Sequence, residues 1–378
     1  MDLAATLRMA AARAGLAALG IASADPFADP RRAMEERMGA GLHGGLRFTY
    51  RDPATATDVW ASFPWARCLV VGSWGYLPAA GSPGPSRAGT GRVARFATAD
   101  HYRPLRAGLQ SLAEVLGNAG WRAEVLCDDH RLVDRAAAVR AGLGWWGKNT
   151  MVLSPGHGPW LLLGSVVTDA VLPASPPSRR SCGTCTACLP ACPTGALIAP
   201  GVLDARRCLA TLAQASGPIP HEYRRAMGDR LYGCDACLEA CPPGRRCLAA
   251  APEGRGRVDL AGLLAADDAA LRRRFGHWYI PGRRVCYLRR NALVALGNAG
   301  GGRARRVAAD YLEDADPLLR AHAAWALGAL GGPEARKALS RGALREDDPS
   351  VREEIRRAAA EAEGDRRAGG TRRGGSVA

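Results

Sequence analysis

The chain carries the stretch CGTCTACLPACP at residues 182–193 and the stretch LYGCDACLEACP at residues 231–242. Seven of its 12 cysteines belong to these two stretches, and an eighth, Cys208, lies between them. Thiols at short fixed spacings in a chain of this length are typical of metal ligation in a reducing compartment, and not of a disulfide scaffold. The two stretches therefore predict a metal centre in the middle of the chain.

The first stretch has the spacing C-x2-C-x2-C-x3-C-P. In bacterial ferredoxins three thiolates of such a run hold one [4Fe–4S] cluster, and the fourth binds the neighbouring cluster. The second stretch repeats the run with Leu231 in place of the first cysteine, so Cys208 is the obvious substitute ligand. This crossing pattern assigns one cluster to Cys182, Cys185, Cys188 and Cys241, and the other to Cys192, Cys208, Cys234 and Cys237.

Zinc is the alternative metal, because C-x2-C pairs also suit a tetrahedral zinc site. The two C-x3-C-P endings, and ligands that divide evenly into two sets of four, favour iron–sulfur clusters. Two neighbouring clusters imply one-electron transfer over a short path. The remaining cysteines match no spacing and are expected to be small buried or half-buried hydrophobic residues; they are Cys68, Cys127, Cys247 and Cys286.

The whole chain has 378 residues, of which 47% are hydrophobic and 23% are charged. These values are ordinary for a globular protein, and the length predicts two or three domains at roughly 150 residues each. No stretch reaches the ~18 consecutive apolar residues of a membrane-spanning helix. The composition therefore excludes a wholly disordered chain and a transmembrane protein.

The N-terminus resembles a weak signal peptide, with an apolar run from Ala14 and the sequence Ala22-Ser23-Ala24 as its cleavage site. Charged residues interrupt that run, and four leucines suit one face of an amphipathic helix instead. We therefore expect a cytoplasmic protein. The charged residues are Asp2, Arg8 and Arg13, and the leucines are Leu3, Leu7, Leu16 and Leu19.

The first 170 or so residues alternate helical and strand-like stretches. Residues 68–74 and 161–168 are short apolar runs that predict buried strands, and residues 105–119 have helical spacing that ends at Gly120. This alternation predicts an α/β or α+β domain. Residues 173–178 are rich in proline and serine, which predicts a linker.

The chain becomes helical and repetitive beyond residue 255. Residues 289–297 align with residues 320–328, and Asp316-Pro317 returns as Asp348-Pro349. A period near 30 residues, in which Ala-Leu-Gly closes one helix and Asp-Pro opens the next, predicts HEAT-type helical hairpins. The basic, glycine-rich tail from Gly364 is expected to be disordered.

The net charge of +15 comes almost entirely from arginine and is concentrated between residues 269 and 309. That segment has ten arginines and no acidic residue, with Phe275, His277, Trp278, Tyr279 and Tyr287 interleaved. Phosphate neutralisation together with planar stacking groups is typical of a nucleic-acid surface. The alternative is a solvated helix face, although such faces usually include acidic residues. The predicted phosphate contacts are Arg283, Arg284 and Arg290.

The N-terminal region offers a group of polar residues at a strand end, Asp128-Asp129-His130, followed by Asp134-Arg135. A glycine-rich turn at residues 142–147 could let the backbone approach a cofactor. The spacings fit neither a dinucleotide fingerprint nor a phosphate loop. From the pattern alone, each carboxylate suits a helix cap or an ion pair better than an acid catalyst. The cobalamin-binding motif D-x-H-x-x-G is also missing, because Val133 stands where the glycine would be.

Taken together, residues 41–328 resemble the epoxyqueuosine reductase family, whose members complete queuosine synthesis in tRNA with cobalamin and iron–sulfur clusters. The resemblance is carried by the two cysteine stretches, by Cys208, by residues 141–149 (AGLGWWGKN) and by residues 290–297 (RNALVALG). It implies an α+β multidomain fold. The implied parts are an α/β cobalamin-binding catalytic domain (1–172), a ferredoxin-like double-cluster domain (173–250), HEAT-like repeats that bind tRNA (255–363) and a basic tail (364–378).

The resemblance also implies roles for individual residues. The family's catalytic acid stands six residues before an acidic-Arg pair and fourteen before the Gly-Leu-Gly turn, and both counts lead to Asp128. Asp129 is the alternative if the register slips by one residue. An external one-electron reductant and a monomeric state are expected. The cobalamin contacts that carry over are Arg51, Asp128, Val152, Leu163 and Ala210.

The sequence departs from the family pattern at several positions. Asp100-His101-Tyr102 stands where Asp-Tyr-His is usual, and Pro159, Leu238 and Gly244 replace the usual Ser, Gln and Asn. None of these changes removes a cluster ligand or the acid. Two other functions remain open at this point: a cobalamin-dependent reductase of a small molecule, similar to reductive dehalogenases, and an electron-transfer protein without a substrate of its own.

Overall fold

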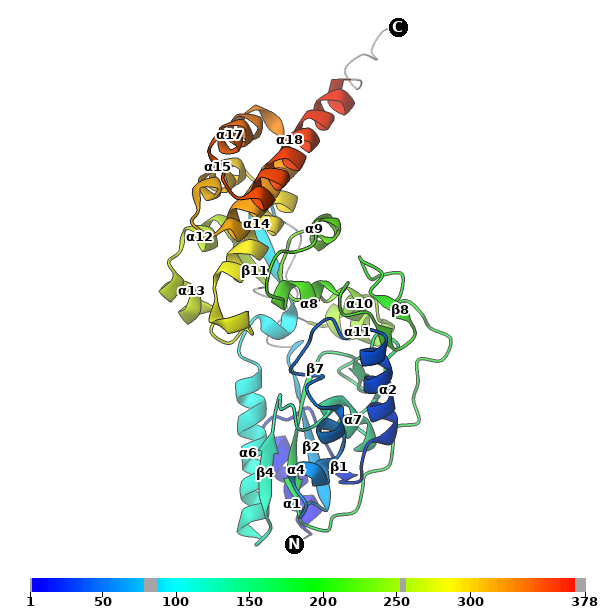
Figure 1. The fold of residues 1–378 in the computed structure, drawn as a ribbon. Helices are drawn as coiled ribbons and strands as arrows, with labels where there is room; N and C mark the ends of the chain where they lie inside the picture. Colours follow the sequence, from blue (N-terminus) through cyan, green and yellow to red (C-terminus); the bar gives the residue numbers. More distant parts are fainter. Residues whose placement is uncertain (1, 78–86, 252–255, 371–378) are drawn as a thin grey trace. The chain divides into compact units, whose positions relative to one another are not determined.

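The computed structural model describes residues 2–77, 87–251 and 256–370, with side chains up to residue 362. The chain forms two compact units, each assembled from three segments (Figure 1). The first unit comprises Met1–Ser82, Thr98–Cys208 and Asp235–Arg255, and the second comprises Pro83–Ala97, Leu209–Cys234 and Gly256–Ala378. The cysteine-rich segment is thus divided between the two units, so the predicted boundary at residue 173 does not coincide with a boundary between them.

The first unit is built on a four-stranded sheet in the order β1 (Ala18–Ser23), β2 (Cys68–Gly75), β7 (Leu161–Thr168), β4 (Ala123–Leu126). All neighbouring strands are antiparallel. The strands predicted at residues 68–74 and 161–168 are therefore confirmed, and the pairing makes this part α+β. Leu69 and Val70 are both fully buried. Because successive residues of a strand point to opposite faces, both faces of the sheet are covered.

Helices cover both faces of this sheet. The alanines of α7 (Asp134–Arg140) pack with Leu69 and Val71 on one face. The helix α6 (Tyr102–Asn118) covers the opposite face, where Leu109 lies over the cross-strand pair Gly72 and Gly164. A Cβ atom on those glycines would lie 3.1 and 2.5 Å from Leu109, so glycine allows the close approach of helix and sheet.

The N-terminal helix is shorter than the leucine pattern predicted. Helix α1 (Leu3–Arg13) packs against α6 and ends before Gly15, whose φ of +72° suits glycine. The chain then enters β1, so Leu16 and Leu19 do not continue the helix face. A turn glycine followed by a strand overrides the helical spacing of the leucines.

Shorter elements complete the first unit. They are α2 (Ala28–Gly39), α3 (Pro53–Thr57), α4 (Val59–Ser62), the hairpin β5 (Trp145–Trp146) and β6 (Val152–Leu153), the hairpin β8 (Leu197–Ala199) and β9 (Val202–Leu203), α10 (Ala236–Glu239) and α11 (Pro242–Ala249).

The second unit joins a small sheet to a stack of helices. The sheet has the order β10 (Arg230–Tyr232), β3 (Thr90–Val93), β11 (Arg257–Asp259). The helices are α8 (Leu209–Gln214), α9 (His221–Met227), α12 (Leu260–Ala265), α13 (Asp268–Arg274), α14 (Cys286–Ala299), α15 (Ala304–Asp310), α16 (Pro317–Leu330), α17 (Gly332–Arg345) and α18 (Pro349–Gly370), with 3-10 turns at Arg95–Ala97, Pro281–Arg283 and Tyr311–Glu313.

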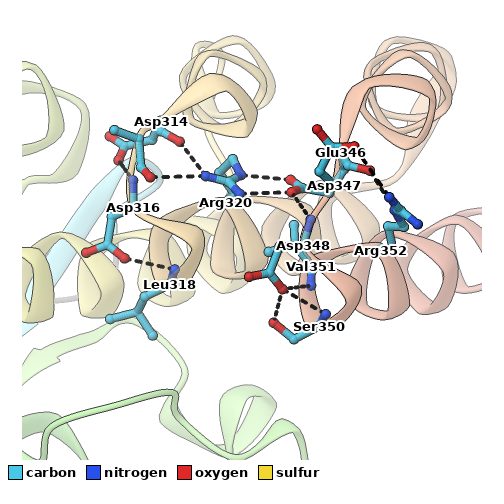
Figure 2. Close-up of polar contacts among 11 residues, drawn as sticks. Asp314, Asp316, Leu318, Arg320, Glu346, Asp347, Asp348, Ser350, Val351 and Arg352 are labelled. Carbon is cyan, nitrogen blue, oxygen red and sulfur yellow. Dashed lines mark hydrogen bonds and ion pairs between the residues drawn. The ribbon is translucent and has the colours of Figure 1, made fainter.

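The predicted repeat is confirmed at its helix starts. Asp316 accepts a hydrogen bond from the backbone N–H of Leu318 (3.0 Å), and Asp348 accepts one from Ser350 (2.8 Å), as Figure 2 shows. Arg320 of one repeat forms a two-pronged ion pair with Glu346, at 2.7 and 2.8 Å, at the edge of the next (Figure 2). The first Asp-Pro-x-x-Arg copy thus combines a helix cap with a link between repeats. In the second copy, Arg352 instead binds the carbonyl oxygen of Glu346 at 2.6 Å, just before its own helix.

The recurring Ala-Leu-Gly marks where successive helices touch. A Cβ atom on Gly297 of α14 would lie 2.9 Å from the Cα of Ala326 in α16. A Cβ atom on Gly328 of α16 would likewise lie 2.8 Å from the Cα of Ala358 in α18. Glycine is required at both positions because the helix backbones approach so closely.

The C-terminal helix continues further than expected. Helix α18 runs to Gly370, whereas the disordered tail was predicted to begin at Gly364. Residues 371–378 lie outside the described residues. No helix in the described part of the chain has both the length and the apolar composition to cross a membrane.

Candidate functional site

The four thiols predicted for the first cluster act on one another in the first unit. Burial raises the pKa of Cys188, and the neighbouring Cys241, Cys182 and Cys185 raise it further. Burial also raises the pKa of Cys241, and the neighbouring thiols of Cys182 and Cys185 raise it further. Cys241 of the second stretch thus lies near the first three cysteines of the first stretch, and their role as ligands of one cluster stays a prediction. Such a thiol set suits an iron–sulfur cluster, whose positive iron would bind the thiolates.

The hairpin of β5 and β6 packs beside this thiol set. Trp145, Leu153 and Cys241 form a small buried core, against which Cys182 packs. Lys148, in the turn of the hairpin, donates a hydrogen bond from Nζ to the carbonyl oxygen of Gly183 at 2.7 Å. Lys148 is one of only two lysines in the chain and belongs to the stretch AGLGWWGKN, which carries part of the family resemblance.

Part of the second thiol set is also held together. Backbone N–H groups, among them that of Ala196 at 3.2 Å from the Cys192 Sγ, outweigh burial and lower the pKa of Cys192. Thr194 and Arg207 exchange hydrogen bonds of 2.7 and 2.6 Å, which tie the Cys192 loop to the residue before Cys208. Stabilised thiolates are what a cluster needs. Cys237 belongs to the first unit and Cys234 to the second, and the full ligand set stays a prediction.

The cysteines outside the two sets lie in ordinary structural places. Cys68 and Cys127 are buried, and burial raises their pKa values to about 11 and about 12. Cys247 and Cys286 are half-buried. Within the described residues, no group of three or more His, Cys, Asp or Glu side chains is arranged to hold a single metal ion.

A cavity of about 490 Å³ lies in the first unit, next to the strand end that carries Asp128. Its volume falls in the range of small-molecule and cofactor sites. The aromatic residues Phe48 and Trp146 are 51% and 44% exposed at this cavity. The charged and aromatic lining comprises Asp29, Arg37, Phe48, Tyr50, Asp128, Asp129, His130, Asp134, Arg135 and Trp146.

The two adjacent aspartates at the cavity have different surroundings. Arg131 binds both oxygens of Asp129, at 3.0 and 2.7 Å, and these hydrogen bonds lower the pKa of that carboxyl. Partial burial raises the pKa of Asp128. The positive charge of Arg106 opposes this rise, and the negative charge of Asp129 adds to it. Carboxyl groups whose pKa values are pushed apart are typical of an acid and an ionised neighbour. Of these two carboxyls, Asp128 is therefore the one that stays protonated to higher pH.

Asp128 is held in an unusual backbone conformation. Its φ is +54°, a region that most residues avoid and that Asp and Asn tolerate best. Thr150, on the same cavity, has a φ of +68°, and its carbonyl oxygen accepts a hydrogen bond from Arg135 at 2.8 Å. Non-glycine residues in this region cluster at functional sites.

A third carboxyl group at the cavity was not singled out for chemistry by its sequence pattern. The Oδ1 of Asp134 is buried without a hydrogen-bond partner among the described residues. Burial, more than the charge of Asp128, raises the pKa of Asp134 well above its usual value. An unpaired carboxyl oxygen in a cavity wall can accept a hydrogen bond from a bound group.

The residues carried over as cobalamin contacts are scattered. Asp128 lines the cavity. Arg51 is exposed and directly follows Tyr50, which lines the cavity. Val152 is buried in β6, and Leu163 packs on the core between the sheet and α7. Ala210 belongs to α8 of the second unit.

The glycine-rich turn before Lys148 packs against the protein itself. A Cβ atom on Gly142, Gly144 or Gly147 would collide with Pro176, Leu153 or Asn149. The glycines therefore allow these segments to approach one another. Gly147 also lines the cavity, so the expectation that the turn lets backbone approach a cofactor stays a prediction there and is not met at Gly142 or Gly144.

The basic segment of the second unit is less exposed than predicted. Arg283 and Arg284 are exposed, and Tyr279 is 64% exposed. Arg290 is completely buried, where it donates hydrogen bonds to the carbonyl oxygens of Leu212, Ala215 and Gly217. The prediction that Arg290 contacts nucleic acid is therefore wrong, because its guanidinium group satisfies buried backbone carbonyls. Phe275, Trp278 and Tyr287 are also buried and cannot stack on bases.

The thiol sets and the helical stack define the class of protein. Residues 181–244 match the 4Fe-4S double cluster binding domain, and residues 285–361 match HEAT repeats. The chain is thus a double-cluster iron–sulfur protein with a HEAT-repeat region.

Comparison with whole proteins gives the family. The chain is 32% identical over 356 residues to the epoxyqueuosine reductase of Bacillus cereus, a match that covers 91% of this chain and 93% of the relative. It is 40% identical over 255 residues to the Xanthomonas campestris enzyme, covering 63% and 70%. A crystal structure of epoxyqueuosine reductase with an epoxyqueuosine-modified tRNA-Tyr stem loop superposes with a TM-score of 0.88 at 29% identity, covering 96% of this chain and 99% of that one. The chain belongs to the epoxyqueuosine reductase family.

Proposed function

We propose that this chain reduces epoxyqueuosine to queuosine in tRNA. The reaction removes the epoxide oxygen: two electrons and two protons convert the epoxide into an alkene and water. The observation that carries the proposal is the match to epoxyqueuosine reductases over 91% of the chain. It is supported by the raised pKa of Asp128 at a cavity of the same unit that holds the first thiol set.

Two bound [4Fe–4S] clusters would supply one-electron transfer from an external reductant. The four interacting thiols of the first set, and the N–H groups directed at Cys192, are what such clusters require. The proposed ligands remain the eight cysteines of the crossing pattern. The protein's part is to hold the clusters and to set their potentials through hydrogen bonds and burial.

We also propose that the cavity takes part of a cobalamin. Its aromatic side chains suit a flat ring system, and the unpartnered Asp134 oxygen suits an amide N–H of the corrin periphery. A bound cobalamin would supply the two-electron reductive chemistry. With a volume of about 490 Å³ the cavity is too small for the whole cofactor, so Arg51, Val152, Leu163 and Ala210 stay proposed contacts outside its lining.

Asp128 is proposed to protonate the departing epoxide oxygen. Its raised pKa keeps more of the carboxyl protonated near neutral pH than that of Asp129, which Arg131 holds ionised. On the second unit, the exposed Arg283 and Arg284 are the proposed phosphate contacts for tRNA.

One experiment tests the proposal against its alternatives. The chain is purified without oxygen, reconstituted with cobalamin, and given tRNA that carries epoxyqueuosine. We expect about eight irons and one cobalt per chain, together with formation of queuosine. Bound cobalamin without tRNA turnover would favour a small-molecule reductase, and clusters without cobalamin would favour an electron-transfer protein.

A further inference from the structure

The hairpin of β5 and β6 places its two tryptophans on opposite sides. Trp145 pairs with Leu153 and Trp146 with Val152. Because successive side chains of a strand point to opposite faces, one indole packs inward and the other outward. Trp145 is only 9% exposed and packs with Cys241 and Cys182, whereas Trp146 is 44% exposed and lines the cavity.

The indole N–H of Trp145 is buried and has no hydrogen-bond partner in the described part of the chain. An indole nitrogen can only donate, and buried donors in proteins normally find an acceptor. Two other buried indoles follow this rule: the Nε1 of Trp160 donates to Gly244 at 2.9 Å, and that of Trp278 donates to Ala97 at 2.7 Å. Trp74 and Trp325 also have unpartnered indole nitrogens, but neither belongs to the core formed with Cys182 and Cys241.

A cluster bound by the first thiol set would place sulfur acceptors near this N–H. Thiolate and sulfide sulfurs of a [4Fe–4S] cluster accept hydrogen bonds, and such bonds help to set its reduction potential. We propose that Trp145 donates its indole N–H to a sulfur of the cluster held by Cys182, Cys185, Cys188 and Cys241, and thereby raises the potential of that cluster. This inference rests on the proposed cluster assignment.

The direction follows from electrostatics. Reduction adds one negative charge to the cluster, and the positive end of the N–H dipole stabilises the reduced form more than the oxidised form. The hairpin is well placed to hold the indole still, because Lys148 binds Gly183 at 2.7 Å and the Asn149 side chain reaches the carbonyl oxygen of Cys237 at 3.5 Å. A preorganised donor does not have to reorient when the electron arrives.

The test compares Trp145→Phe with the matched control Trp146→Phe in the reconstituted full-length protein. Both clusters are titrated with a chemical reductant and followed by electron paramagnetic resonance. We expect Trp145→Phe to lower one of the two potentials while the other stays unchanged. A tenfold weaker preference for the reduced form corresponds to a shift of about 59 mV for one electron. Trp146→Phe should change neither potential.

A second variant removes the ambiguity of a smaller side chain. Replacing Trp145 by 3-benzothienylalanine puts sulfur in place of the N–H and keeps the shape of the indole. The same fall in one potential is expected, with unchanged iron content. Full iron with unshifted potentials in this variant, or an equal shift in Trp146→Phe, would overturn the proposed bond. A wild-type chain that lacks about eight irons would instead contradict the cluster assignment, and the proposed bond would fall with it.

Discussion

At the scale of single residues, the pair Asp128 and Asp129 shows how neighbouring carboxyls acquire different chemistry. Arg131 holds Asp129 by both oxygens, while Asp128 occupies a left-handed backbone position at the cavity. Counting along the sequence predicted Asp128 but left Asp129 open as a slip of one residue. The ion pair that separates the two could not be predicted, because Arg131 follows both aspartates closely in the sequence.

We expect Asp128→Asn to bind cobalamin and tRNA normally and to lose turnover. Asn keeps the size of the side chain and tolerates a φ of +54°, but it cannot release a proton. The loss should be about a hundred- to ten-thousand-fold, the range typical of general acid catalysis. Single-turnover conversion of epoxyqueuosine-tRNA measures it, and Asp129→Asn serves as the control. Near-normal turnover in Asp128→Asn would mean that the carboxyl only caps the following turn.

The pH dependence of turnover should also show that Asp128 acts as an acid. An acid works in its protonated form, which is present below its pKa and lost as the pH rises through it. Because burial raises the pKa of Asp128, the protonated form survives to higher pH than for an exposed aspartate. We expect a falling alkaline limb of kcat that moves to lower pH in a variant that exposes the cavity, such as Phe48→Ala. A pH-independent kcat would argue against an acid at this position.

At the scale of elements, the recurrence of sequence motifs predicted the helical stack, and the contacts explain the motif. Asp316 and Asp348 cap helices, and Gly297 and Gly328 allow helices to cross closely. What the recurrence could not predict was the fate of the arginines. Arg290 belongs to the same α14 helix and is buried, because the carbonyls that it binds come from residues 212–217, far away in the sequence.

Gly328→Val should destabilise the second unit. Its Cβ atom would lie 2.8 Å from the α18 backbone, so the helices must separate, and such overpacking costs about 1–3 kcal/mol. Thermal unfolding followed by circular dichroism measures the loss. Gly302→Val, at an exposed position with nothing within 4 Å of the added Cβ, is the control. Equal stability of the two variants would contradict the close crossing.

Substitution of single cysteines tests the crossing pattern of cluster ligands. Cys208→Ala should remove one cluster only and leave about four irons per chain, because the first thiol set does not use Cys208. Iron analysis and electron paramagnetic resonance of the reduced protein measure this. Cys247→Ala is the matched control, since its thiol instead donates to the carbonyl oxygen of Gly156. If Cys247→Ala lost the cluster and Cys208→Ala kept it, the substitute ligand would be the other cysteine.

At the scale of the whole molecule, the family was predictable because cysteine spacing is fixed by cluster chemistry. The division of the chain into these two compact units was not predictable, since each unit is assembled from segments far apart in sequence. Of the three arginines predicted to contact nucleic acid, Arg290 is buried, whereas Arg283 and Arg284 are exposed and stay predictions. Net charge indicates an anionic partner, but exposure decides which arginines can reach it, and exposure depends on tertiary packing.

Arg283→Gln combined with Arg284→Gln should weaken tRNA binding and reduce its salt dependence by roughly two phosphate contacts. Both side chains are exposed, so folding and iron content should be unchanged. Binding isotherms at several salt concentrations measure the slope. Arg290→Gln should behave differently, because it removes buried hydrogen bonds and lowers the unfolding temperature. An unchanged slope in the double variant would exclude these two arginines as phosphate contacts.

Cys188 and Cys241 are far apart in the sequence, so a cluster that binds both would close a long loop of the chain. All of residues 209–234, a segment of the second unit, lie inside the loop that this cluster would close. Metal insertion would then act as a reversible cross-link that lowers the entropy of the unfolded chain, as a disulfide bond does. A protein that has acquired its iron should thus survive a single backbone cut within that loop, with both fragments retained, whereas iron-free chains would come apart at the same cut.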